Sequence, residues 1–107
     1  KFSYRGKTFP VYNTPEIIEA VRESVKDVFN KGFVVNQSFK IGGDDFCFFS
    51  ENTPATYIIV GSANEDKETQ YPLHNPKFNV DEEVIKIGAA AFAKIAYDYL
   101  NGKYKGI

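Results

Sequence analysis

The feature that most constrains the fold of this chain is an unbroken apolar run, Tyr57 to Val60, which ends at Gly61. A short run that is apolar on both faces is typical of a strand buried on both sides, as in the sheet of an α/β protein. A second apolar run, Phe33 to Val35, predicts another strand, and the alternating pattern of Lys1 to Phe9 predicts a third.

Three helical patterns alternate with these predicted strands. The first begins at Pro15, with Thr14 as its predicted cap and Gly32 as its predicted stop. The second spans Asp45 to Glu51, and the third is a long helix capped by Asp81. The residues expected to face the core from this third helix are Ile85, Ala89, Phe92, Ala96, Tyr99 and Leu100. The alternating order predicts a layered α/β fold in which the first and third helices cover one sheet.

Composition narrows the class of protein. With 107 residues, the chain is one domain or part of one, and 43% hydrophobic residues are enough for a globular core. A net charge of -1 gives no electrostatic case for nucleic acid or for an anionic membrane surface. No apolar run approaches the roughly 20 residues that span a bilayer. A single Cys excludes a disulfide framework and a thiolate zinc cluster. We expect a cytoplasmic protein without nucleic-acid or membrane partners.

The start of the sequence suggests incompleteness. The chain opens on Lys1 and contains no Met. We therefore expect a processed chain, an excised domain or a recombinant fragment.

The irregular segment Ser62 to Val80 carries the first chemical candidate. Loops of this length inside a compact domain are uncommon and tend to be functional. The segment contains the sole histidine, His74, with Pro72 and Pro76 two residues away on either side. Prolines stiffen the backbone, which suits a metal ligand or a catalytic base. An exposed or structurally hydrogen-bonded histidine is the more common interpretation and stays open, because one His alone cannot form a zinc site.

The second candidate is the turn Gly42-Gly43-Asp44. Paired glycines let a backbone approach a ligand closely, and a following helix N-terminus can bind an anion. A plain turn into a helix, with an Asp cap, is at least as good an interpretation. Structural roles are expected for a buried Cys47 and for a solvated loop tip, Glu65 to Glu68. The aromatic residues expected in the core are Phe46, Phe48, Phe49 and Tyr57.

Four motifs, in this order, resemble one known family. They read FPVYNTPE at Phe9 to Glu16, IGGDDF at Ile41 to Phe46, PLHNPKFNVDE at Pro72 to Glu82, and IGA at Ile87 to Ala89. The chain is similar to the C-terminal part of the N-acyl-amino-acid amidohydrolases, which include hippurate and auxin-conjugate hydrolases and are aminoacylase-like dinuclear metallopeptidases. Two positions depart from the family pattern: Ile41 replaces Met and Asp44 replaces Glu.

The resemblance implies roles for the candidate residues. His74 matches the last metal-ligating His, and Gly42, Gly43 and Asp44 match the rim of the substrate site. It implies no catalytic residue in this chain, since the general-base carboxylate and the other ligands belong to upstream segments. Two divalent metal ions (zinc, manganese or cobalt) are implied for the complete enzyme, and none bound tightly by this chain alone.

The resemblance also implies an organisation. Residues 1–9 match the last strand of an inserted lid domain, and residues 10–107 match the C-terminal part of a metallo-aminopeptidase-like catalytic domain. The complete enzyme would cleave the amide of a small N-acyl amino acid or peptide, and would form a homodimer through the lid. The alternative is a free-standing, non-catalytic remnant that serves as a binding or interaction module.

Overall fold

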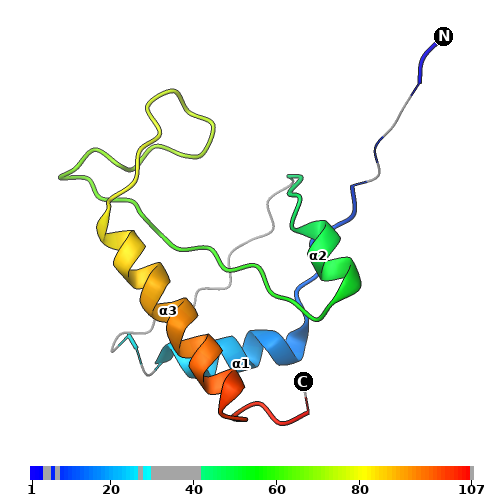
Figure 1. Ribbon diagram of the computed structural model, residues 1–107. Helices are drawn as coiled ribbons and strands as arrows, with labels where there is room; N and C mark the ends of the chain where they lie inside the picture. Colours follow the sequence, from blue (N-terminus) through cyan, green and yellow to red (C-terminus); the bar gives the residue numbers. More distant parts are fainter. Residues whose placement is uncertain (4–5, 7, 27, 30–41, 107) are drawn as a thin grey trace.

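The protein consists of three helices joined by long irregular segments, in a computed structural model that describes residues 1–3, 6, 8–26, 28–29 and 42–106. Helix α1 spans Pro15–Lys26, α2 spans Cys47–Asn52 and α3 spans Glu83–Leu100 (Figure 1). No strand occurs among these described residues, including the described part of Lys1 to Phe9. The strand predicted at Phe33 to Val35 lies outside them. None of the helices described here is long and apolar enough to cross a membrane.

Helix α1 begins at Pro15 as predicted, but the side chain of Thr14 does not cap it. Thr14 Oγ1 accepts a hydrogen bond from Ala55 N at 3.1 Å, and Thr14 N donates to Ala55 O at 2.8 Å. The threonine therefore fastens the start of α1 to the segment that follows α2. The predicted stop at Gly32 lies outside the described residues. The apolar side chains of α1 after Pro15 are buried or half-buried, and Val25 is among the buried ones.

Helices α1 and α3 pack against each other around a buried polar contact. Ser24 Oγ on α1 donates to Asp98 Oδ2 on α3 over 2.6 Å. Lys94 Nζ lies 2.5 Å from Asp98 Oδ1, and Lys103 Nζ and Tyr104 OH contact Oδ2 at 3.1 Å and 3.3 Å. The Lys94 ammonium group and the Ser24 hydroxyl hold the pKa of Asp98 well below its usual range. In the described residues the two helices cover each other, whereas we expected them to cover a sheet.

Apolar residues surround α3, and most of them are exposed. All six residues predicted to face the core are exposed, and Phe92 and Leu100 reach 66% and 82%. The predicted burial is wrong. Phe92, Ala96 and Tyr99 line an open hollow beside α1 but stay exposed. The buried residues of α3 are Ala91 and Asp98. A helix that is hydrophobic all round is normally buried on all sides. Such a helix needs more covering structure than α1 provides.

The segment Tyr57 to Val60 is extended, but it is not the buried strand that we predicted. Its side chains are 37–66% exposed, and it pairs with no strand in the described part of the chain. The Tyr57 N–H donates to the side-chain oxygen of Asn13 at 2.6 Å. Side-chain contact at one end cannot replace two flanking strands, and the apolar residues therefore stay accessible. The layered sheet remains a prediction.

The chain is more open than a folded monomer of this length. Its radius of gyration is 16.5 Å, against about 13 Å expected for a compact domain. It exposes 9221 Å² of surface, where a compact monomer exposes roughly 6,000 Å². Much of the apolar surface that the sequence offers for burial is therefore uncovered.

Candidate functional site

His74 occupies the third position of a tight turn from Pro72 to Asn75. Asn75 N donates to Pro72 O at 3.1 Å, and the φ angle of His74 is 69°. A positive φ at the third position is the mark of a type II turn, where glycine or asparagine is usual. A histidine in this region is strained and persists only where the surroundings fix it. The side chain of His74 is exposed, as expected for a histidine on the loop.

A second turn follows at once and stiffens the same loop. Asn75 O accepts from Phe78 N at 2.9 Å, and Asn75 Oδ1 accepts from Lys77 N at 2.9 Å. Pro76 stands at the second position of this turn, where its fixed φ is favoured. Lys77 Nζ lies 5.4 Å from the centre of the Tyr71 ring. The predicted stiffness around His74 thus takes the form of two consecutive hydrogen-bonded turns.

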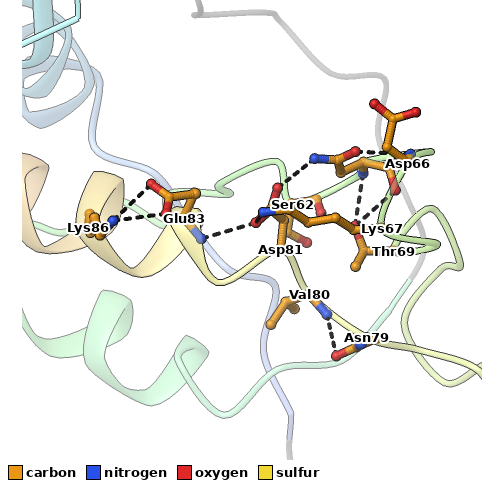
Figure 2. A network of polar contacts seen from close by, with 10 residues as sticks. Ser62, Asp66, Lys67, Thr69, Asn79, Val80, Asp81, Glu83 and Lys86 are labelled. Carbon is orange, nitrogen blue, oxygen red and sulfur yellow. Dashed lines mark hydrogen bonds and ion pairs between the residues drawn. The ribbon is translucent and has the colours of Figure 1, made fainter.

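A polar network closes the base of this loop (Figure 2). Thr69 is 4% exposed, and its hydroxyl donates to Ser62 O at 2.8 Å while accepting from Asn64 N at 2.9 Å. The carboxylate of Asp81 accepts from Asn64 Nδ2 at 2.7 Å and from Lys67 Nζ at 2.6 Å. These contacts join the beginning of the loop to its end. We call Ser62, Asn64, Lys67, Thr69 and Asp81 the loop-base network.

Asp81 also starts α3. Its Oδ1 accepts from Glu83 N at 3.2 Å, so the predicted capping role of Asp81 is confirmed. The Lys67 ammonium, the Asn64 amide and this N–H together lower the pKa of Asp81 to about 2. Asp81 also raises the pKa of Lys67, chiefly through the same hydrogen bond. One ionised carboxylate therefore ties the loop to α3.

In the glycine turn before α2, the side chain of Asp44 accepts a hydrogen bond from the backbone of the same turn. Asp44 Oδ1 accepts from Phe46 N at 2.8 Å, and Oδ2 accepts from Tyr57 OH at 3.2 Å. The hydrogen bond to Asp44 raises the pKa of Tyr57. Gly42 and Gly43 are exposed, with open space where a Cβ would stand. Asp44 thus acts as the predicted cap, and its carboxylate takes the place that an anion would occupy at this short helix.

The aromatic residues around α2 form a cluster that stays largely exposed. The Phe46 ring lies 5.3 Å from the Tyr57 ring and 5.9 Å from the Phe49 ring. Phe48 and Phe49 are 46% and 64% exposed, so their predicted place in the core is wrong. The Phe9 ring packs edge-on against the Phe48 ring at 6.2 Å, but both side chains stay exposed. Cys47 is fully buried, as predicted.

The structure does not bring the two candidates into one site. The extended segment 53–61 runs from α2 to the loop, so α2 and the loop of His74 lie at opposite ends of it (Figure 1). Among the described residues, no group of three or more His, Cys, Asp or Glu side chains could hold a metal ion. An exposed imidazole on a stiff turn fits the role of one metal ligand. The remaining ligands would have to come from outside the described residues.

Sequence reasoning missed Asn64, Lys67 and Thr69. Asn64 Oδ1 accepts from Asp66 N at 3.1 Å, which is an Asx turn that the spacing could have suggested. The pairing of Asn64 with Asp81, 17 positions away, leaves no such local signal. The tip Glu65 to Glu68 is exposed as predicted, although Lys67 reaches back from it.

Comparison with known proteins gives a consistent family. The profile described as Peptidase family M20/M25/M40 matches residues 1–98. Thermostable carboxypeptidase 1 of Saccharolobus solfataricus is 37% identical over 89 residues, which are 83% of this chain and 22% of that protein. IAA-amino acid hydrolase ILR1-like 6 of Arabidopsis thaliana is 39% identical over 64 residues, which are 60% of this chain and 14% of that protein.

A more distant relative covers more of the chain. Putative amidohydrolase YhaA of Bacillus subtilis is 26% identical over 99 residues, which are 92% of this chain and 25% of that protein. The chain therefore spans about a quarter or less of the length of these relatives. No solved structure matches the chain.

Proposed function

Because the chain belongs to Peptidase family M20/M25/M40, we propose that it is the C-terminal segment of a metal-dependent amidohydrolase. The substrates would be N-acyl amino acids or small peptides. The observation that carries this proposal is the family match over residues 1–98. Relatives named as a carboxypeptidase, an IAA-amino acid hydrolase and a putative amidohydrolase support the same reaction class.

In this proposal His74 is one ligand of a pair of divalent metal ions. The exposed imidazole on two consecutive turns supports the role, since a metal ligand must be held in place and remain accessible. When bound, such a pair of ions supplies an activated water and polarises the scissile carbonyl. This chain contributes the imidazole and, at Gly42, Gly43 and Asp44, part of the rim where substrate binds. The general base and the other ligands belong to the rest of the polypeptide.

The open shape of the chain supports a segment of a longer enzyme over a free-standing remnant. The apolar sides of α3 and the exposed residues Tyr57 to Val60 are suited to burial under further structure. We assign residues 1–9 to the end of a lid domain and residues 10–107 to the catalytic domain. The lid would provide the contacts of a homodimer.

The test uses the complete polypeptide that contains this chain. It should hydrolyse N-acyl amino acids or dipeptides with zinc, manganese or cobalt, and it should lose activity in a chelator. The variant His74→Ala should lose bound metal and nearly all turnover while keeping its far-UV circular dichroism, because the side chain is exposed. Lys77→Ala, in the same loop, is the matched control and should keep both. Full metal content and turnover in His74→Ala would refute the ligand role.

The isolated 107-residue chain tests whether the other metal ligands lie outside it. A chain that lacks most ligands should show no turnover with any of the three metals. The non-catalytic remnant predicts the same result, so this experiment tests only the location of the ligands. Measurable hydrolysis by the purified chain would contradict the proposal that the other ligands lie elsewhere.

A further inference from the structure

We propose that Thr69 and Asp81 are positioning residues, which set the place of His74 by closing the base of its loop. The inference rests on the proposed role of His74 as a metal ligand. It concerns how that ligand is held, through residues that do not themselves touch metal or substrate.

The carbonyl oxygen of Ser62 accepts two hydrogen bonds from distant parts of the loop. It accepts from Thr69 Oγ1 at 2.8 Å and from Asp81 N at 3.3 Å. One backbone oxygen at the beginning of the loop therefore receives a donor from its middle and a donor from its end. The part that carries His74 lies between these two donors, so both of its ends are fixed to the same atom.

Thr69 is itself held by the turn that precedes it. Thr69 N donates to Asn64 O at 3.0 Å, and Glu68 N donates to Glu65 O at 3.1 Å. Glu68 has a φ of 52°, and the two hydrogen bonds have the pattern that commonly ends a helix. This turn places the Thr69 hydroxyl where it can bridge Ser62 and Asn64 with almost no exposure to water.

Asp81 connects the loop to α3. Its carboxylate accepts from Asn64 and Lys67 on the loop side and from the N–H of Glu83 on the helix side (Figure 2). The loop is thereby fixed relative to α3, the longest helix among the described residues. Sites supported by a helix are more precise than sites on an unsupported loop.

The expected consequence is a change in the population of the ligating conformation. His74 holds a strained backbone conformation, which persists only when its surroundings determine it. If breaking the loop-base network lets the loop leave this conformation, the apparent metal affinity falls in proportion to the fraction of molecules that keep the ligating conformation. A loop that is competent one tenth of the time binds about tenfold more weakly.

The experiment measures zinc affinity of the complete enzyme by competition with a chromophoric chelator. Thr69→Val removes the hydroxyl at nearly constant volume and should weaken zinc binding by about tenfold or more. Thr69→Ser keeps the hydroxyl and should restore parental affinity. Thr53→Val, at an exposed threonine away from the loop, controls for the substitution itself and should leave zinc affinity unchanged.

Hydrogen exchange of the metal-free enzyme provides a readout independent of activity. Backbone amides of residues 70–79 should exchange faster in Thr69→Val than in the parent, while those of α1 stay protected. Should Thr69→Val not fold, Lys67→Ala is the second variant. Lys67 is exposed, and its loss weakens the loop-base network at Asp81. It should weaken zinc affinity in the same direction.

The outcomes keep the two proposals separate. If Thr69→Val leaves zinc affinity unchanged while His74→Ala abolishes binding, the positioning role is refuted and the ligand role stands. Should Thr69→Val not fold, the same conclusion is drawn from Lys67→Ala. If His74→Ala itself retains zinc, the proposed function fails first. A uniform loss of stability with unaltered zinc affinity of the folded protein also refutes the positioning role.

Discussion

The contact between α1 and α3 includes one buried hydroxyl whose removal has a calculable effect on stability. Ser24 is fully buried and donates to the Asp98 carboxylate over 2.6 Å. A hydrogen bond to a charged group contributes about 1.5–3 kcal/mol to stability. Ser24→Ala removes the donor, but Lys94, Lys103 and Tyr104 still contact the carboxylate. Because Asp98 is not left without partners, we expect the lower half of that range, about 2 kcal/mol.

Urea unfolding of the chain at low protein concentration, where light scattering shows a monomer, measures this change by far-UV circular dichroism, since the chain has no Trp for fluorescence. With a slope of about 1–2 kcal/mol per molar, typical of small domains, the midpoint should fall by about 1–2 M. Ser50→Ala is the matched control. The Ser50 hydroxyl bonds only neutral partners, Cys47 O at 3.1 Å and Tyr12 N at 3.3 Å. Its loss should cost about 1 kcal/mol or less.

A double-mutant cycle tests whether the charge is responsible. In an Asp98→Asn background, Ser24→Ala should have a clearly smaller effect, because the acceptor is no longer ionised. An equal loss of stability in both backgrounds would refute the reasoning. So would an unchanged midpoint for Ser24→Ala alone.

Three further outcomes are expected. Because the pKa of Asp98 is lowered on folding, its carboxylate stabilises the folded state fully above the unfolded value of 3.8, and this contribution is lost as the pH falls through the folded value. An acid series of thermal melts should therefore show a smaller loss of stability in Asp98→Asn than in the parent, because the variant keeps the contribution of Asp81 but lacks that of Asp98. Asp44→Asn should lower the ionisation midpoint of Tyr57 in a nuclear magnetic resonance titration that resolves this ring among the seven tyrosines, whereas Asp45→Asn should leave it unchanged. The isolated chain should self-associate through its uncovered apolar surface. Light scattering that shows a clean monomer at high concentration would count against the proposal that the chain is a segment of a longer enzyme.

Local features of the molecule were largely predictable from the sequence. Pro15 begins α1 and Asp81 caps α3, because a helix end depends on residues within one turn of it. The irregular stretch around His74, with its stiff turns and exposed side chain, also follows from neighbouring prolines and Asn75. The motifs in the same stretch identified the family that the profile match shows.

The tertiary structure decided what each apolar surface meets and which distant polar groups pair. Periodicity showed that α3 and the run Tyr57 to Val60 are apolar, but burial depends on what lies across from them, and in the described chain little does. Ser24 with Asp98, and Asn64 with Asp81, are pairs 74 and 17 positions apart. Neither pair has a signal in its neighbours, because a hydrogen bond is set by short-range geometry that only the folded chain brings about.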